Sequence, residues 1–238
     1  MDPEISIVVP FHNEGPNVLP LVRAVFTALS KETAGIELLL IDDGSADDTW
    51  ERMLESQRAD SRVRILRHGR NAGQSAALWT GFRASRGKVI GTLDGDLQND
   101  PADLPGMLAE LANCDLVCGV RTRRMDNLVR RLSARIARLA RKLALGVDFR
   151  DTGCNLRVFR RGILQTLPAF NGVHRFMPIL AQSGGALVRE IPVAHHPRTA
   201  GKSNYGVWNR LGRGIYDLLM VRWLLKRQIQ NVSVNEIP

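Results

Sequence analysis

Residues 88–98 read Lys-Val-Ile-Gly-Thr-Leu-Asp-Gly-Asp-Leu-Gln, an apolar run that ends in oxygen-bearing side chains at every second position. The apolar part, residues 88–93, predicts a buried strand. In extended backbone, side chains two and four residues apart share a face, so Asp94, Asp96 and Gln98 are expected to meet in one small volume. Two carboxylates that close repel each other unless a cation lies between them. Oxygen ligands of this number suit Mg²⁺ or Mn²⁺, completed by substrate phosphates.

A second interpretation of the same residues stays open. Asp-Gly is a turn signal, so Asp94 and Asp96 are alternatively plain turn residues. Just beyond them, Asp100 precedes Pro101, and Asp103 follows. That pattern predicts a helix N-cap at Asp100 with proline in the first helical position.

Strands and helices alternate over the first 120 residues. Apolar and β-branched runs predict strands at residues 5–9, ended by Pro10, and at residues 37–41, 63–66, 88–93 and 115–119. Helical spacing predicts helices at residues 18–29, 47–58 and 74–84. Strands separated by helices of about 10 to 15 residues indicate βαβ units. The expected fold class is α/β, with a Rossmann-like, mainly parallel sheet flanked by helices.

Polar residues follow several of these strands, at the edge where parallel sheets bind ligands. Glu14, Asp43 and Asp94 are acceptors that can read a ribose hydroxyl or a base N–H. Asp96 and Gln98 would hold a divalent ion against a diphosphate. The chain has no Walker pattern, and no GxGxxG follows the first strand. A phosphoryl-transfer ATPase or a dinucleotide dehydrogenase is therefore poorly supported.

The composition is that of an ordinary globular protein. The chain has 238 residues, of which 44% are hydrophobic and 24% charged. No apolar run reaches the roughly 18 residues that cross a bilayer, and the amino terminus has no basic segment of a secretory signal. Cys114, Cys118 and Cys154 form no metal-ligand pattern, which indicates reduced thiols in a cytoplasmic protein.

Positive charge is concentrated in the second half. The net charge is +9, and residues 121–142 hold nine basic side chains against the single acid Asp126, which makes +8. Apolar residues recur at helical spacing over residues 128–145, with arginines on the other face. A basic amphipathic helix is typical of binding to an anionic membrane surface or another polyanion. A surface helix docked by its apolar face is the alternative.

The remaining elements are predicted from the same patterns: a strand at 156–159, a helix at 173–182, a strand at 186–193, a polar loop at 195–206 and a helix at 207–230. The last helix carries two tryptophans on an apolar face, which suits the bilayer interface, the parent domain or a second copy of the chain. We expect a single catalytic domain over residues 1–230, with a tail at 231–238. Within it, residues 1–120 would bind a nucleotide, 121–206 an acceptor, and 207–230 form the amphipathic helix.

Three motifs carry a resemblance to a known family. Residues 8–14, 41–45 and 93–98 resemble the inverting glycosyltransferases of family 2, which have the GT-A fold. The Leu-Gln after Asp96, the Asp-Thr-Gly at 151–153 and the loop at 196–205 resemble the dolichol-phosphate (polyprenyl-phosphate) mannose synthase branch. The resemblance covers about residues 5–228.

The resemblance implies roles for individual residues. Those that would bind the nucleotide sugar are Pro10, His12, Glu14, Asp43, Asp94, Lys202 and Ser203. Those that would ligate Mg²⁺ or Mn²⁺ are Asp94, Asp96 and Gln98. Those that would act at the reacting phosphates, together with Asp96, are Arg121, Arg131, Ser133 and Arg198; spacing does not choose firmly between Arg130 and Arg131.

The implied reaction transfers a hexose, with mannose from GDP-mannose as the leading donor, to a polyprenyl phosphate such as dolichyl or undecaprenyl phosphate. Because this acceptor is already an anion, no protein base is needed, and attack from behind the diphosphate inverts the anomeric carbon. Many family members continue into transmembrane helices after the position of Lys226. We therefore expect peripheral attachment to the inner face of the cell membrane, or attachment through a membrane-anchoring partner or a homodimer.

Two alternatives stay open. A family 2 enzyme can use a different donor, such as a UDP-sugar, or a hydroxyl acceptor in cell-envelope polysaccharide or lipid synthesis, with Asp151 as base. We favour a loop-anchoring role for Asp151. A nucleic-acid-binding protein is the non-enzymatic alternative, but the basic window has no interleaved aromatic residues and no reader motif, so no nucleic-acid partner is expected.

Overall fold

The computed structural model describes residues 3–32, 35–122, 128–197 and 207–227. The chain forms two compact units. The first comprises Met1–Asn127 and Phe149–Ser203, and the second comprises Leu128–Asp148 and Asn204–Pro238. Each unit is described by itself below.

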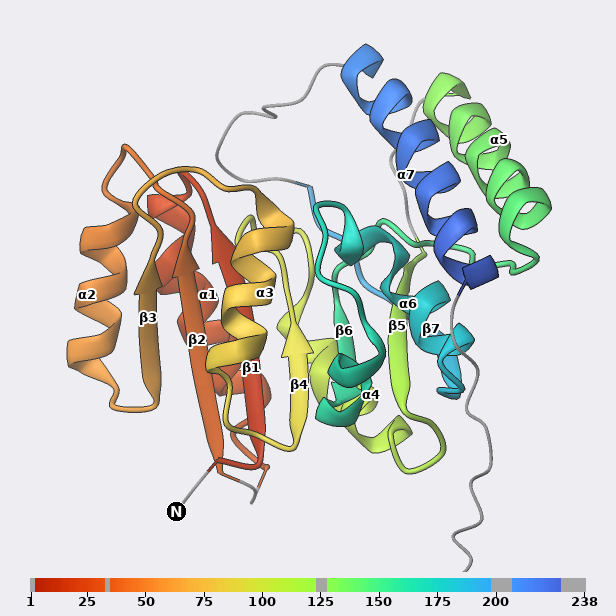
Figure 1. Ribbon diagram of the computed structural model, residues 1–238. Coiled ribbons are helices and arrows are strands. Elements are labelled where there is room, and N and C mark those ends of the chain that lie inside the picture. Colours follow the sequence, from red (N-terminus) through yellow and green to blue (C-terminus); the bar gives the residue numbers. More distant parts are fainter. Residues whose placement is uncertain (1–2, 33–34, 123–127, 198–206, 228–238) are drawn as a thin grey trace, which may run out of the picture. The chain divides into compact units, whose positions relative to one another are not determined.

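The first unit is built on a mixed sheet with the strand order β3-β2-β1-β4-β6-β5-β7 among the described residues (Figure 1). The strands are β1 (Ile5–Phe11), β2 (Ile36–Asp42), β3 (Val63–Arg67), β4 (Val89–Thr92), β5 (Leu116–Arg121), β6 (Arg157–Arg160) and β7 (Val188–Val193). Neighbouring strands are parallel except at β6, which is antiparallel to both β4 and β5. The predicted α/β class with a mainly parallel sheet is confirmed.

Helices cover both faces of this sheet (Figure 1). Those on one face are α1 (Gly15–Ala28), α2 (Thr49–Ala59) and α4 (Leu104–Glu110), and those on the other are α3 (Gln74–Ala84) and α6 (Val173–Ser183). Short 3₁₀ turns occupy Pro101–Asp103 and Arg161–Thr166. As predicted, the Asp100 side chain caps the first of these turns by accepting from the Ala102 N–H at 2.9 Å, with Pro101 in its first position.

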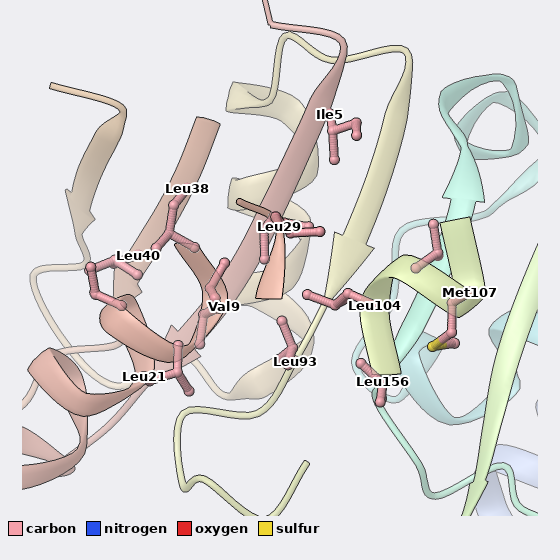
Figure 2. Close-up of a cluster of buried hydrophobic side chains, with 14 of the residues drawn as sticks. Ile5, Val9, Leu21, Leu29, Leu38, Leu40, Leu93, Leu104, Met107 and Leu156 are labelled. Atoms are coloured by element: carbon pink, nitrogen blue, oxygen red, sulfur yellow. The ribbon is translucent and has the colours of Figure 1, made fainter. Parts of the chain in front are cut away.

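Successive side chains of β1 alternate between the two faces of the sheet, so this strand packs against helices on both faces. Ile5 and Val9 belong to the apolar cluster that α1 and α4 close with Leu21, Leu104 and Met107 (Figure 2). Ile7 lies on the same face, whereas Val8 points to α3, as alternation in a strand requires.

On the α3 face the packing needs a glycine. A Cβ on Gly81 would lie 2.2 Å from Cγ1 of Val8, so only glycine lets the helix lie this close to β1. Close packing holds the first turn of α3 near the carboxyl ends of β1 and β4.

Strand β1 extends through Pro10, where the sequence predicted its end. The Asp43 N–H donates to the Phe11 carbonyl at 2.8 Å, so Phe11 faces β2. By alternation the nitrogen of Pro10 faces the β4 side, where pairing already ended at Val8 and Thr92. Proline therefore breaks no ladder hydrogen bond there, which is why the strand tolerates it.

The second unit contains two long helices, α5 (Leu128–Leu145) and α7 (Val207–Arg227), which lie side by side (Figure 1). The bounds of α5 are those predicted, and α7 is described as far as Arg227. Among the described residues, no helix combines the length and apolar character needed to cross a bilayer. The three cysteines of the first unit are buried free thiols, as expected.

Candidate functional site

The residues after β4 form a turn and not the extended continuation that the sequence suggested. The strand ends at Thr92, and Gly95 and Asp96 lie in a turn. Leu97 has a φ of +58°, a left-handed conformation that is uncommon for a side chain of its size. The prediction that Asp94, Asp96 and Gln98 share one face of an extended strand was therefore wrong, because the backbone turns between Asp94 and Gln98.

Asp94 and Asp96 nevertheless come together. Burial and the neighbouring charge of Asp96 raise the pKa of Asp94 to about 6, against the opposing effects of an Asn155 hydrogen bond and the charges of Arg121 and Arg157. Asp96 itself is buried, with 8% of its surface exposed. Two close carboxylates with little solvent are the arrangement that a cation stabilises.

Two amides fix the orientation of Asp94. Gln74 Nε2 donates to its Oδ1 at 2.7 Å, and Asn155 Nδ2 donates to the same oxygen at 2.9 Å. Gln74 comes from the first turn of α3 and Asn155 from the segment before β6. Because both amides bind Oδ1, Oδ2 is the oxygen that stays available to a ligand.

Gln98 is oriented by the segment that follows β7. The His196 N–H donates to the Gln98 carbonyl at 2.9 Å, and Gln98 Nε2 donates to the His196 carbonyl at 3.4 Å. His196 is itself held by Asp100 at 2.9 Å. With its amide nitrogen on His196, Gln98 is left with Oε1 as its ligand atom.

The side chains after β4 fit the predicted metal. Asp94, Asp96 and Gln98 present oxygen atoms only, which Mg²⁺ and Mn²⁺ prefer. Within the described residues, no group of three or more His, Cys, Asp or Glu side chains could hold a metal ion. A cation here would thus have two carboxylates and one amide from the protein, and a phosphate group would have to complete its shell.

The predicted nucleotide residues lie at the ends of β1 and β2. His12 donates from Nδ1 to the Asp43 carbonyl at 3.0 Å, and Glu14 accepts from the Asn17 amide at 2.6 Å. Asn13, with a φ of +55°, accepts from the Ala46 N–H at 2.8 Å and so joins the two loops. Pro10 is buried in β1.

Asp43 binds the loop after β3. Its Oδ1 accepts from the Ala72 N–H at 2.9 Å and from His68 at 2.7 Å, and its Oδ2 accepts from the Gly73 N–H at 2.8 Å. The side chain is buried, and these bonds use most of its acceptor capacity. Asp43 therefore holds the start of α3 in place, whatever else it contacts.

A hollow of about 340 Å³ opens beside this loop, lined by Gly44, Ser45, Arg67, His68 and Gly69. It does not include the carboxylates after β4, which lie two strands away in the order β2-β1-β4.

Arg121, predicted to bind the acceptor phosphate, is held by Asp151. Its Nε and Nη2 donate to the two carboxylate oxygens at 2.7 and 2.8 Å, and both side chains are largely buried. This fork joins the end of β5 to the segment before β6 and supports the loop-anchoring interpretation of Asp151.

The other predicted acceptor residues lie outside what the structure describes. Arg130, Arg131 and Ser133 belong to α5, whose backbone is described there but whose side chains are not. Arg198, Lys202 and Ser203 lie wholly outside the described residues. Their roles stay predictions.

Several contacts of the site were not predicted from the sequence. Gln74 and Asn155, which hold Asp94, are separated from it by 20 and 61 positions. Arg157 is 2% exposed and donates to the carbonyls of Thr152 and His174. An arginine inside the apolar run of a predicted strand was the one available signal, since a buried charge needs partners.

Carboxylates at the end of β4, in a mixed sheet whose helices cover both faces, are the arrangement expected of a GT-A glycosyltransferase. The chain belongs to glycosyl transferase family 2, which residues 6–167 match.

Two relatives with similar names are each 38% identical to this chain. One is the dodecaprenyl-phosphate galacturonate synthase of Rhizobium johnstonii, matched over 229 residues, 94% of this chain and 68% of that protein. Another is the undecaprenyl-phosphate 4-deoxy-4-formamido-L-arabinose transferase of Salmonella choleraesuis, matched over 218 residues, 91% of this chain and 66% of that protein. The chain thus spans about two thirds of the length of these relatives.

Solved structures share the fold. Glucosyl-3-phosphoglycerate synthase from Mycobacterium tuberculosis, in complex with Mn²⁺, UDP and glucosyl-3-phosphoglycerate, superposes with a TM-score of 0.68 at 20% identity, over 92% of this chain and 80% of that chain. The same enzyme with Mg²⁺ and UDP gives a TM-score of 0.69.

Proposed function

We propose that this protein transfers a sugar from a nucleoside-diphosphate sugar to a polyprenyl phosphate, with a divalent cation. The observation that carries the proposal is the pair of neighbouring carboxylates at the end of β4, half-buried Asp94 and buried Asp96, in a family 2 glycosyltransferase domain. The names of the relatives, which are polyprenyl-phosphate sugar transferases, support the acceptor class.

The donor would lie across the strand ends. The hollow beside Asp43 lies at the end of β2 and β3, and the carboxylates lie at the end of β4. Two strand spacings separate β2 from β4, about 10 Å, which a nucleoside diphosphate can span. The nucleoside would occupy the hollow side, and the diphosphate would reach Asp96 and Gln98.

The cation would be held by Asp94 Oδ2, Asp96 and Gln98. When bound, it would offset the charge of the diphosphate as its bond to the sugar breaks. The protein's own contribution is orientation, because Gln74, Asn155 and the His196 carbonyl fix the ligand side chains before any donor arrives.

For the acceptor, the proposal keeps the predicted residues Arg121, Arg131 (or Arg130), Ser133 and Arg198, with Lys202 and Ser203 at the donor phosphates. The acceptor phosphate oxygen attacks the anomeric carbon while the bond to the diphosphate breaks on the opposite side, so the configuration inverts. Asp151 supports this acceptor over a hydroxyl one, since both of its oxygens bind Arg121 and a hydroxyl acceptor would need a free base.

The sugar is better sought outside the mannose series. Galacturonate and 4-deoxy-4-formamido-L-arabinose stand in the names of the relatives, so mannose from GDP-mannose receives no support from them. We therefore place UDP-linked acidic and amino sugars ahead of GDP-mannose.

Attachment to the membrane would be peripheral, on its cytoplasmic face. In the second unit, Leu143 of α5 and Trp223 of α7 are 77% and 61% exposed. Exposed apolar side chains on helices with many basic residues suit an anionic bilayer surface. A membrane-anchoring partner or a second copy of the chain would be an additional contact.

The direct test is incubation of the purified protein with UDP- and GDP-sugars, Mg²⁺ or Mn²⁺, and polyprenyl phosphate, followed by extraction of glycolipid. A product that forms with one donor and disappears with EDTA is the expected result. Absence of glycolipid with every donor would reject the proposal. Loss of activity on Asp151→Asn with full activity of Arg131→Ala would favour a hydroxyl acceptor instead.

A further inference from the structure

The start of α6 is bonded to the start of α3. Gly172, whose φ is +112°, precedes α6, and its N–H donates to Ser75 Oγ at 2.8 Å. The same hydroxyl oxygen lies 2.6 Å from Nδ1 of His174. Ser75 is buried, whereas His174 is only half-buried.

These contacts favour one tautomer of His174 over the other. Ser75 Oγ already accepts from Gly172, and among the described residues its own hydrogen has no acceptor other than His174 Nδ1. We assign Nδ1 as the acceptor and the N–H to Nε2, because the other tautomer would leave the Ser75 hydrogen without a partner. Burial, with the charges of Arg175 and Arg157, lowers the pKa of His174 to about 3, so the ring is neutral at physiological pH.

The Nε2–H group has no protein partner in the described part of the chain. The interactions of His174 are those of Nδ1 with Ser75 and of its carbonyl with Arg157. A partly exposed donor with a fixed hydrogen can serve a ligand without first breaking an internal bond.

The position of His174 relates it to Asp94. Ser75 directly follows Gln74, whose amide is bonded to Asp94 Oδ1. Arg157, which donates to the His174 carbonyl, is one of the charges that act on Asp94. The start of α6 is thus held by Ser75, the sequence neighbour of a residue that binds Asp94, and by Arg157, whose charge acts on Asp94.

We infer that His174 is a specificity-determining residue that donates a hydrogen bond from Nε2 to an oxygen of the donor's sugar. This inference rests on the proposed function, because it needs a nucleotide sugar whose diphosphate lies at Asp94 and Asp96. A neutral N–H suits a hydroxyl or carbonyl oxygen, whereas a phosphate gains more from a cationic donor. Sites that pair with a substrate oxygen in this way discriminate strongly against sugars that lack it.

Two substitutions separate this role from a structural one. In His174→Asn the side-chain oxygen can replace Nδ1 and keep the bond to Ser75, but nothing reaches the place of Nε2. In His174→Gln the amide nitrogen can replace Nε2, but the bond to Ser75 is lost. The measurement is calorimetric binding, with Mg²⁺, of UDP and of the UDP-sugar that the wild type prefers, and of GDP and the GDP-sugar if that pair binds instead.

We expect His174→Asn to lose about tenfold in affinity for the nucleotide sugar, the effect of one lost hydrogen bond, while its affinity for the nucleotide alone is unchanged. His174→Gln should keep the preference of the wild type for the sugar-bearing ligand. The opposite pattern, with Asn like the wild type and Gln weakened for both ligands, would overturn the inference and make His174 structural.

Thermal unfolding identifies a variant that fails to fold. Should both fail, Ser75→Ala keeps Nε2 but releases the ring, and we expect it to weaken binding of the nucleotide sugar and not of the nucleotide. Equal weakening of both would overturn the inference. A wild type that binds nucleotides but no nucleotide sugar would instead refute the proposed function itself.

Discussion

At the scale of single residues, Asp94 has the properties of a carboxylate that a bound cation would stabilise. Its pKa of about 6, raised by burial and by Asp96, lies above the ordinary carboxyl value of 3.8. The folded protein therefore binds more protons than the unfolded chain between these two values. Consequently the free energy of unfolding falls as the pH rises from about 4 to about 6.

Asp94→Asn removes this penalty, so we expect the metal-free variant to have a higher Tm than the wild type at pH 7.5 and no advantage at pH 4. Asparagine keeps an oxygen for the amides of Gln74 and Asn155. Calorimetry in EDTA measures both values, and adding Mn²⁺ with a nucleotide should raise the Tm of the wild type alone. A variant less stable than the wild type at pH 7.5 in EDTA would contradict the repulsion between Asp94 and Asp96.

At Asp96 the expected effect is on function. Asp96→Ala should abolish turnover and the metal-dependent part of nucleotide binding, because the cation loses one of its two carboxylates. Circular dichroism and thermal unfolding should show an intact fold. Full activity of this variant with Mg²⁺ or Mn²⁺ would refute the metal assignment.

At the scale of the elements, Glu37 of β2 stabilises the end of the sheet opposite the candidate site, where the parallel strands begin. This side chain is 4% exposed and accepts from Ser6 Oγ of β1 and Arg64 of β3, each at 2.6 Å, and from the Arg86 N–H at 2.5 Å. Burial raises the pKa of Glu37, but these bonds outweigh it and bring the pKa below the ordinary 4.5.

Glu37→Gln leaves Arg64 facing an amide, so we expect a loss of about 2–3 kcal/mol in the free energy of unfolding at pH 7. A carboxylate whose pKa is lower in the folded protein than in the unfolded chain stabilises the fold at pH values above its unfolded pKa. This stabilisation is lost as the pH falls through the folded pKa. The difference between wild type and variant should therefore shrink below about pH 4. Urea unfolding at pH 7 and pH 3.5 measures it; a constant difference would mean that the charge of Glu37 has no part in it.

Elements were more predictable from this sequence than the contacts between them. Helices α3 and α5 have the predicted bounds, since apolar spacing is a local property. The end of β1 was not predictable, because whether proline breaks a strand depends on which neighbour its nitrogen faces.

The acidic side chains of the site could be predicted from their positions after strands, whereas the residues that hold them in place could not. Gln74 and Ser75 lie at the start of the predicted helix 74–84, and His174 lies in the predicted helix 173–182, with nothing in the pattern to distinguish them. Their roles arise from contacts across 20 to 99 positions of sequence, and no periodicity reports such contacts.

At the scale of the whole molecule, the second unit carries two matching apolar stripes. The stripe on α5 consists of Ile136, Leu139 and Leu143, and the stripe on α7 consists of Tyr216, Leu219 and Trp223. Each of these side chains is 57–77% exposed. Both follow the spacing i, i+3, i+7, which puts three side chains on one face of a helix. Soluble surfaces rarely gather so many large apolar groups, and basic residues accompany them here.

We expect the double substitution Leu143→Glu and Trp223→Glu to lower the affinity for anionic vesicles at least tenfold, since each side chain contributes about 1.5–3 kcal/mol when fully buried. Wild-type binding should weaken with salt, because basic side chains are attracted to acidic lipids. Vesicle co-sedimentation at two salt concentrations measures both effects. Leu187→Glu is the control, since Leu187 is also a largely exposed leucine (59%) but belongs to the first unit.

A comparison of two acceptors then shows whether the second unit acts in membrane binding or in the transfer reaction. If the second unit serves to meet the bilayer, the double variant should lose activity on polyprenyl phosphate embedded in vesicles but keep it on a short prenyl phosphate dissolved in water. Equal loss on both acceptors would place these helices in the reaction itself, where the arginines of α5 would be the first residues to examine. Unchanged vesicle binding would exclude the stripes as the contact and leave a partner protein or a second copy of the chain to cover them.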